Sequence, residues 1–439
     1  MYLYTENQEE MDKQRLLQVL LDQQEELDSL VSDDYVQRTE AKQFEFNSKL
    51  AQVVIGVRRS GKSTLCHMAL RNKGVKYGYV NFDDDRLYKL AVDDFNDILE
   101  TLYIIYGTDV KYLFFDEIQN VDGWHLFVNR LLRLGLHVFV TGSNAKLLST
   151  ELATHLTGRY NEIRLYPFSF SEYCKARHVV TDKATTKNIA AQQAALYEYL
   201  MEGGFPELDG ISNRHAYVEG IVNTIITKDI KARFKLRNEE GIKVLANHFI
   251  NNVGQLTNVK DITENLGIGT AKTVRNYMDY LTQAFLILPI SKFSYKSSVR
   301  IRGDKVYIID TGLMTYRHNS LSSENLGWRL ENVVMTELLR RTNPSYQDIY
   351  YYRPGSTSRE VDFVVTDHSK PMELIQVSFD ISNPKTLRRE LMALADASQK
   401  LHCDNLTLVT MSQTRTEKLD GVKINVISAH EWLLTAPAC

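Results

Sequence analysis

The stretch that most constrains this chain is Val53–Thr64, which reads Val-Val-Ile-Gly-Val-Arg-Arg-Ser-Gly-Lys-Ser-Thr. β-Branched residues lead into Gly56, and the spacing to Gly61–Ser63 satisfies G-x-x-x-x-G-K-[ST]. Because a helical pattern follows from Leu65 to Leu70, the stretch predicts a strand, a glycine loop and a helix. The backbone N–H groups of such a loop form a concave cradle for phosphate oxygens.

The motif gives each of its polar residues a chemical role. Lys62 can reach the β- and γ-phosphates, and the Ser63 hydroxyl can hold Mg²⁺. The expected cofactors are therefore ATP and Mg²⁺. The alternative is an ordinary turn between a strand and a helix, but the strand and helix on either side favour the phosphate loop. The candidate nucleotide-binding residues are Gly56, Val57, Arg58, Arg59, Ser60, Gly61, Lys62, Ser63 and Thr64.

Two carboxylates end a later apolar strand, Lys111–Glu117. Such a run is typical of a buried parallel strand whose carboxyl end opens into a site. Asp116 is the second candidate ligand of Mg²⁺, and Glu117 is the candidate that polarises a water for in-line attack on the γ-phosphate. An Asp-Glu pair can also cap a helix or lie in a solvated turn. Its place after the glycine loop, with the strand Tyr77–Phe82 between, favours the nucleotide site.

Further candidates for catalysis follow the fourth strand, His137–Asn144. Ser143 or Asn144 can orient the attacking water, or can cap the helix expected over Ala145–Leu156. Arg159 is a candidate cationic finger that reaches the nucleotide of a neighbouring subunit, and the alternative is an ordinary surface arginine.

Composition limits the broad class of the protein. At 439 residues the chain is long enough for about three domains. With 44% hydrophobic and 24% charged residues it is typical of a soluble globular protein. The net charge of −3 supports no global attraction to nucleic acid or membrane. The four scattered cysteines and the absence of a long apolar run predict a cytoplasmic protein without a disulfide framework or a zinc site.

Six motifs, taken in order, resemble those of the prokaryotic AAA-type ATPase family that carries a C-terminal domain of unknown function similar to restriction endonucleases. The motifs are Val54–Ser63, Leu113–Gln119, Val140–Asn144, Leu156–Arg159, Tyr166–Tyr173 and Gly203–Glu207. The resemblance implies an additional-strand P-loop ATPase core, and we expect the protein to act as a ring or another oligomer. It also implies that the acid pair, the sensor and the arginine fall on the residues already singled out.

The expected fold class is α/β, with a P-loop NTPase core on a parallel sheet, a helical lid, a winged helix-turn-helix and a C-terminal PD-(D/E)XK-like α/β domain. In the lid, Lys228 and Asp229 are either site residues or part of a solvated helix face. The N-terminal helices either pack on the ATPase core or contact another subunit. The expected boundaries are 1–45 for the N-terminal helical segment, 46–180 for the core, 181–237 for the lid, 238–318 for the winged helix and 319–439 for the last domain.

The expected winged helix is locally basic. Between Gln255 and Lys305, Lys and Arg number eight and Asp and Glu number four. Basic side chains on a recognition helix and a β-wing suit phosphate contacts with double- or single-stranded DNA, although such domains also serve as subunit contacts. The candidate nucleic-acid residues are Lys272, Arg275, Lys292, Lys296, Arg300 and Arg302, with Tyr295 available for stacking.

The C-terminal region resembles a PD-(D/E)XK nuclease with an altered site. Glu331 and Asp362 match the family's metal ligands. Gln376 replaces a Glu, and Ser378 stands where the Lys is expected, so a domain that binds nucleic acid or protein without cleaving is favoured. The sequence as a whole predicts a Mg²⁺-dependent ATPase that couples nucleotide state to DNA binding or remodelling. The alternatives are a nucleotide-gated signalling or assembly switch for protein partners and, less favoured, an active nuclease.

Overall fold

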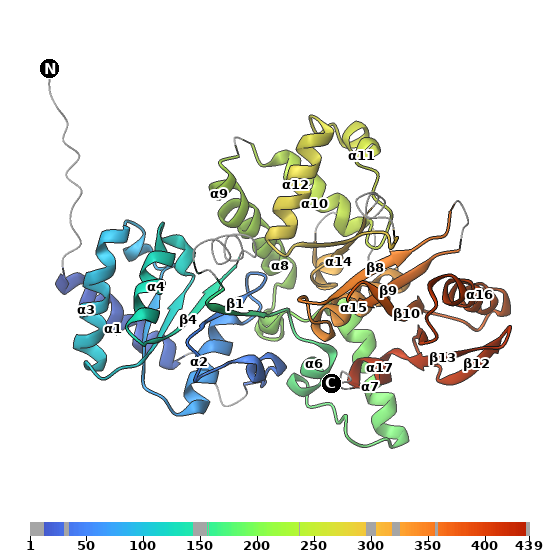
Figure 1. Ribbon diagram of the computed structural model, residues 1–439, viewed down its shortest axis with the longest axis horizontal. Coiled ribbons are helices and arrows are strands. Elements are labelled where there is room, and N and C mark those ends of the chain that lie inside the picture. The colour runs from blue at the N-terminus through green and yellow to red at the C-terminus, as the bar shows by residue number, and fades with distance from the viewer. Residues whose placement is uncertain are drawn as a thin grey trace. The chain divides into compact units, whose positions relative to one another are not determined.

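The computed structural model describes residues 13–29, 35–143, 156, 158–236, 238–295, 304–317, 325–355 and 359–435 (Figure 1). It divides into two compact units. The N-terminal unit comprises Met1–Gly56 and Gly61–Leu165, and the C-terminal unit comprises Val57–Ser60 and Tyr166–Cys439. The middle of the glycine loop therefore groups with the C-terminal unit, while both of its ends belong to the N-terminal one. Within the described ranges, no helix is long and apolar enough to cross a membrane.

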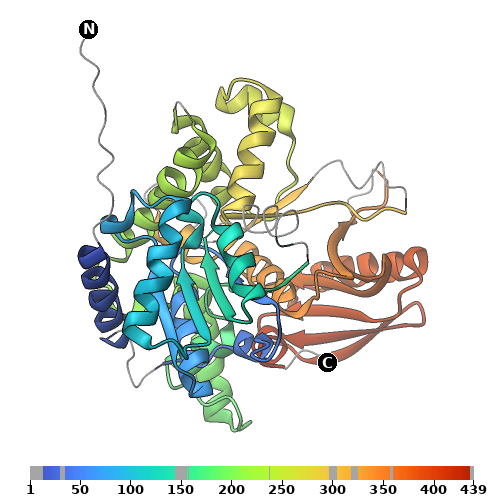
Figure 2. The same cartoon turned by 60° about the vertical axis from the view of Figure 1, so that its left-hand side comes forward.

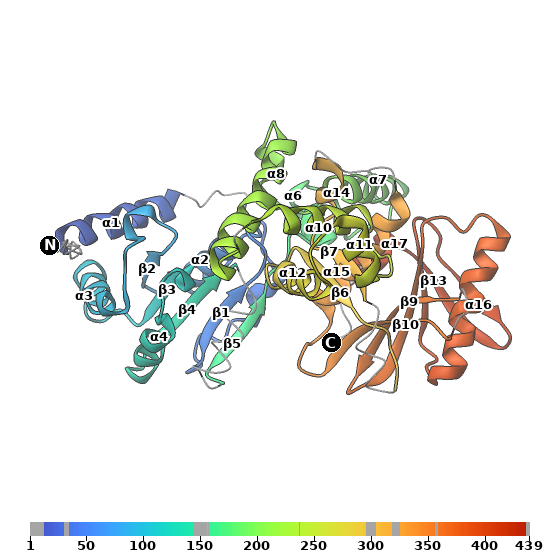
Figure 3. The same ribbon diagram turned by 90° about the horizontal axis from the view of Figure 1, so that it is seen from above.

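A parallel five-stranded sheet in the order β2-β3-β4-β1-β5 forms the N-terminal unit (Figure 3). Its central strands are buried on both faces, which explains their continuous apolar sequences. β4 lies between β1 and β3, so the additional strand expected for the core is present. The strands are β1 (Ala51–Ile55), β2 (Tyr77–Asn81), β3 (Tyr112–Asp116), β4 (His137–Gly142) and β5 (Tyr160–Arg164).

The helices of this unit cover the sheet. α1 (Lys13–Ser29) lies against α3 (Phe95–Tyr106) and β2, and the apolar side chains Leu16, Val19, Leu20 and Leu27 are buried. The expected packing of the N-terminal helix on the core is therefore confirmed. The remaining elements are α2 (Lys62–Lys73), α4 (Trp124–Arg133) and the short helices η1 (Thr39–Gln43), η2 (Asp85–Leu87), η3 (Val92–Asp94) and η4 (Ile118–Asn120).

The C-terminal unit begins with a helical segment. Within the expected helical lid, α8 (Arg214–Thr224) is followed directly by a π-helix, η7 (Ile225–Lys231). The other elements of this segment are α6 (Phe170–Ala176), α7 (Thr186–Glu202), η6 (Pro206–Gly210) and α9 (Ala232–Phe234).

Three helices and a two-stranded sheet come next. The two paired strands are β6 (Ile287–Ile290) and β7 (Lys305–Ile308), which are antiparallel. Residues 296–303 lie outside the described residues. The helices are α10 (Glu240–Asn251), α11 (Val259–Leu266) and α12 (Ala271–Gln283), followed after β7 by α14 (Gly312–Tyr316).

The chain ends in a mixed six-stranded sheet in the order β12-β13-β11-β10-β9-β8, drawn in orange and red (Figure 2). Its core includes Val364, Leu374, Leu394, Leu408 and Val426. The strands are β8 (Gln347–Tyr352), β9 (Val361–Asp367), β10 (Lys370–Ser378), β11 (Leu406–Thr410), β12 (Arg415–Leu419) and β13 (Val422–Ser428), and the helices are α15 (Leu326–Arg341), α16 (Pro384–Leu401) and α17 (Ala429–Leu434).

A buried carboxylate joins α7 to the turn after β7. Asp310 accepts hydrogen bonds from the backbone N–H of Gly204 (2.7 Å) and of Gly312 (2.8 Å), and burial raises its pKa to about 6. Gly203 has φ +81°, and a Cβ there would lie 1.8 Å from Asp310 Oδ1. Close approach to Asp310 therefore explains Gly203, whereas a Cβ at Gly204 would lie 2.4 Å from the carbonyl oxygen of Phe168.

We expect Gly203→Ala to lower the free energy of unfolding by about 2–4 kcal/mol. The methyl group would displace a buried hydrogen-bond acceptor, and the left-handed backbone adds strain. Gly210→Ala is the matched control, since nothing lies within 4 Å of a Cβ there, and it should change stability by less than about 0.5 kcal/mol. Denaturant unfolding measures both variants, and equal stabilities would contradict this role of Gly203.

Candidate nucleotide site

The glycine loop lies at the carboxyl end of β1, where it leads into α2. Gly61 caps α2 with φ 90°, a conformation that favours glycine. Lys62 is the first residue of the helix, and its side chain is only 5% exposed. The first backbone N–H groups of α2 have no partner within the helix and suit an anion.

The two carboxylates that end β3 lie beside this loop. Lys62 Nζ is 3.7 Å from Glu117 Oε1, and the Ser63 hydroxyl donates a hydrogen bond to Asp116. Burial raises the pKa of Asp116, and the charge of Glu117 adds to the effect. Glu117 has φ +50°, which is uncommon for a residue with a side chain and is a form of backbone strain found at functional sites. The structure therefore brings together four residues that the sequence analysis selected.

Two residues of the site were not selected from the sequence. Thr141, near the end of β4, donates a hydrogen bond to Asp116 Oδ1 and accepts one from the backbone N–H of Glu117 at 3.0 Å. The hydroxyl of Tyr79 lies 3.4 Å from Asp116 Oδ2. A polar residue at the carboxyl end of the strand between β1 and β3 was the available signal for Thr141. These contacts orient the carboxylate of Asp116 and the backbone of Glu117.

A hard cation fits this set of donors. Asp116 is a buried carboxylate beside the Ser63 hydroxyl, and Mg²⁺ is typically held by one or two protein oxygens together with phosphates and water. Within the described ranges, no group of three or more His, Cys, Asp or Glu side chains is arranged to hold a metal ion. The two-donor arrangement is the one expected of a metal held jointly with a phosphate.

The remaining catalytic candidates have different outcomes. Ser143 is buried directly after β4, and Asn144 lies outside the described residues. Arg159 is exposed and precedes β5, whose first residue, Tyr160, pairs with Ala51 at the start of β1. Arg159 thus lies at the edge of the sheet opposite the glycine loop. It is not part of the site of its own subunit.

The two arginines of the glycine loop face carboxylates of the C-terminal unit, to which they belong. Arg58 pairs with Asp229 of η7 at 3.1 Å, and Arg59 pairs with Glu207 of η6 at 3.1 Å. Asp229 is 8% exposed, so the solvated helix face considered for it is wrong. Lys228 is exposed.

The candidate nucleic-acid residues are only partly described. Lys272 and Arg275 are exposed on α12, and Tyr295 is 64% exposed. Lys292 forms an isolated parallel bridge with Tyr351 of β8. Lys296, Arg300 and Arg302 lie outside the described residues.

The altered nuclease-like residues are adjacent in the C-terminal unit, with one exception. Asp362 accepts a hydrogen bond from the backbone N–H of Val377 (3.0 Å), and its own N–H donates to Gln376 Oε1 (3.3 Å). Gln376 donates to Glu390 Oε2 at 2.9 Å. Ser378 instead hydrogen bonds to the carbonyl oxygen of Asp380.

A lysine counted among the basic residues of the expected winged helix lies among these carboxylates. Lys305 Nζ is 3.1 Å from Glu331 Oε1, 3.3 Å from Asp362 Oδ1 and 2.7 Å from Glu360 Oε1. Its side chain is 5% exposed. Burial lowers and the surrounding groups raise the pKa of Lys305, and the net result lies well above its ordinary value. The ammonium group among these carboxylates therefore comes from β7.

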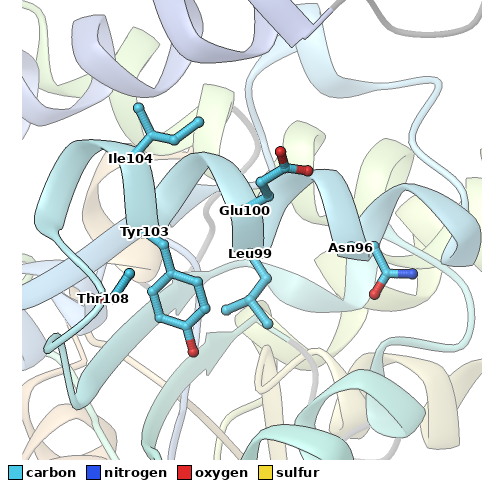
Figure 4. Close-up of a pocket in the computed structure, with 6 residues that line it drawn as sticks. All are labelled: Asn96, Leu99, Glu100, Tyr103, Ile104 and Thr108. Carbon is cyan, nitrogen blue, oxygen red and sulfur yellow. The ribbon is translucent and has the colours of Figure 1, made fainter.

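A surface hollow of about 440 Å³ lies on α3 (Figure 4), and none of its lining residues belongs to the glycine loop. Leu99 and Tyr103 project from one side of the helix, and Ile104 is 65% exposed. One helix and Thr108 just beyond it line the hollow, so it offers none of the groups that a nucleotide requires.

Comparison with known families divides the chain into three parts. Residues 48–174 match an AAA domain. Residues 193–324 match a domain of unknown function (DUF8612), and residues 326–432 match another (DUF4143). The core that carries Lys62, Asp116 and Glu117 is thus an AAA-type P-loop domain.

Similar solved structures include the RuvB Holliday junction branch migration motor from Thermotoga maritima, with 17% identity and a TM-score of 0.27 over 61% of this chain and 88% of that one. Cdc6p from Pyrobaculum aerophilum has 11% identity and a TM-score of 0.27 over 70% of this chain and 98% of that one. Scores this low do not establish a common arrangement of the whole chain.

Two relatives align over most of the chain. The uncharacterized protein MJ1544 of Methanocaldococcus jannaschii is 36% identical over 401 residues, which cover 88% of each chain. An uncharacterized protein of Haemophilus influenzae is 30% identical over 402 residues, or 87% of this chain and 94% of its own. The chain therefore belongs to the same family as these archaeal and bacterial proteins, with its P-loop AAA domain over residues 48–174.

Proposed function

We propose that this protein is a Mg²⁺-dependent ATPase that acts as an oligomer and couples its nucleotide state to DNA. The observation that carries the proposal is the meeting of Lys62, Ser63 and two carboxylates at one edge of the sheet. A phosphate-binding ammonium group, a hydroxyl, a metal-binding carboxylate and a second carboxylate are the parts that ATP hydrolysis requires.

Each of these residues has a distinct role in the proposed reaction. Lys62 binds the β- and γ-phosphates, and Ser63 and Asp116 would hold Mg²⁺, which when bound neutralises phosphate charge. Glu117 orients the attacking water and accepts its proton. Thr141 holds the backbone of Glu117 and the carboxylate of Asp116 in place, with one hydrogen bond to each. Ser143 or Asn144 is proposed to assist Glu117, and Arg159 to act on the nucleotide of a neighbouring subunit.

Glu117→Gln tests the catalytic role. The amide keeps the shape of the side chain but cannot accept a proton, so we expect ATP turnover to fall by more than about tenfold while ATP binding persists. Glu100→Gln, an exposed change on α3, is the matched control. Steady-state phosphate release and nucleotide titration measure the two effects. Turnover equal to that of the unchanged protein would remove Glu117 from the mechanism.

DNA is the proposed partner of the segment from α10 to β7, which we propose is a winged helix-turn-helix. Lys272 and Arg275 lie exposed on α12, the helix that would enter a major groove. The exposed ring of Tyr295 can stack on a base. Lys292, Lys296, Arg300 and Arg302 remain proposed phosphate contacts of the wing.

The double variant Lys272→Ala and Arg275→Ala should weaken duplex DNA binding and lower the slope of log affinity against log salt by about two, because two phosphate contacts are lost. The variant Lys385→Ala and Arg388→Ala removes the same charges from exposed positions on α16 and should leave binding unchanged. Fluorescence anisotropy at several salt concentrations measures both. Absence of DNA binding at low salt would instead favour the nucleotide-gated switch for protein partners.

The nuclease-like cluster is proposed to be structural, within a PD-(D/E)XK-like domain that does not cleave. Lys305 already places a positive charge among Glu331, Glu360 and Asp362. It extends from β7, so the cluster joins the two-stranded sheet to the last domain. Gln376 is held by Glu390 and by the backbone of Asp362 rather than directed at a substrate.

Lys305→Met should lower the free energy of unfolding by about 3–5 kcal/mol, because it leaves buried carboxylates without their cation. Lys260→Met is the control, since Lys260 is 81% exposed, and its effect should stay below about 0.5 kcal/mol. Thermal and denaturant unfolding report both. Plasmid cleavage by the unchanged protein that needs Mg²⁺ and is lost in Asp362→Ala would instead make the cluster a nuclease site.

A further inference from the structure

The two arginines in the middle of the glycine loop are held very differently. Arg58 makes a two-point contact with Asp229, with Nη2 3.1 Å from Oδ1 and Nε 3.3 Å from Oδ2. The side chains are 17% and 8% exposed. Arg59 contacts Glu207 through Nη1 alone, and these side chains are 55% and 47% exposed. The first pair is geometrically fixed, whereas an exposed pair like the second contributes little.

Asp229 belongs to an unusual turn. η7 is a π-helix of seven residues, a rare conformation that is frequent at functional sites. Ile225, Ile226 and Ile230 of the same turn are buried. The turn is therefore packed in place, and a movement of this segment would carry Asp229 with it.

The loop itself needs support from outside. Arg59 has φ +67°, and Gly61 has φ +90°. A residue with a side chain persists in this region only where its surroundings impose the conformation. Arg58 precedes Arg59 directly, so the contact with Asp229 fixes the backbone beside the strained residue. The same backbone supplies N–H groups to the proposed phosphate cradle.

We propose that Asp229 is a positioning residue for nucleotide binding, acting through Arg58, and that the π-helical turn and the nucleotide are thereby thermodynamically coupled. The proposal rests on the ATP binding proposed above. Coupling is reciprocal: the nucleotide must stabilise the turn by the same factor by which the intact turn tightens nucleotide binding. The two-point contact between Arg58 and Asp229 is the basis for this route.

Titration with a non-hydrolysable ATP analogue and Mg²⁺ tests the positioning role. Asp229→Asn should weaken binding by about 5- to 150-fold, the usual range of coupling between sites. Arg58→Ala should do the same, and the double variant should be no weaker than either single one, because both single changes break the same contact between Arg58 and Asp229. Glu207→Gln, the control from the exposed pair, should stay within about twofold. Additive losses, or an unchanged affinity of Asp229→Asn, would overturn the proposal.

Hydrogen exchange of residues 225–231 tests the coupling directly. Saturating analogue should slow exchange there in the unchanged protein but not in Asp229→Asn, even at concentrations that saturate the variant. The coupling is contradicted if the analogue also slows hydrogen exchange in the variant. It is equally contradicted if the unchanged protein binds the analogue without any slowing of exchange. If the unchanged protein binds no analogue, the proposed ATPase function fails as well.

A second variant separates positioning from a loss of folding. Arg58→Lys retains the charge but cannot reproduce the two-point contact, so its affinity should lie between those of the unchanged protein and Arg58→Ala. Thermal unfolding identifies any variant that does not fold. If folded Arg58→Lys binds the analogue as weakly as Arg58→Ala does, the geometry of the contact alone determines the affinity. If it binds the analogue as tightly as the unchanged protein does, the positioning role of the contact is overturned.

Discussion

The candidate site depends on the parallel register of three neighbouring strands. β4 pairs with β1 on one side and β3 on the other, so the carboxyl ends of all three meet at one edge of the sheet. This register places Thr141 between the glycine loop and the acid pair, where its hydroxyl contacts both Asp116 and Glu117. β4 also holds β1 and β3 in register, and this places Lys62 Nζ 3.7 Å from Glu117 Oε1.

The sequence was sufficient for the parts of the site that are local in the chain. The strand, loop and helix around Gly56–Ser63 and the acid pair that ends β3 follow from spacing and apolar runs, and the structure places them together. Thr141 and Tyr79 were missed because their roles depend on which strands are neighbours, and strand order is not written in the sequence of any one strand. The last three strands, β11 to β13, were also missed.

Ion pairs between residues far apart in the chain were the second feature that could not be predicted from the sequence. Asp229 and Arg58 are 171 positions apart, and Asp229 was considered either a site residue or part of a solvated face. Lys305 was counted in the basic charge of the expected winged helix, yet it is buried against carboxylates up to 57 positions away. In both cases a charge whose exposure is ambiguous in the sequence finds its counter-charge through tertiary packing. The prediction of a helical lid likewise did not distinguish the α-helix α8 from the π-helix η7, because buried positions recur in both.

The most direct test of the central claim is calorimetric titration of the unchanged protein and of Lys62→Ala with a non-hydrolysable ATP analogue and Mg²⁺. A lysine that binds a triphosphate donates hydrogen bonds from its ammonium group to charged phosphate oxygens, so its removal should weaken binding by at least about tenfold. We predict that the unchanged protein binds the analogue measurably and that Lys62→Ala binds it at least about tenfold more weakly. Equal affinities, or no binding by the unchanged protein, would contradict the assignment of this edge of the sheet as a nucleotide site.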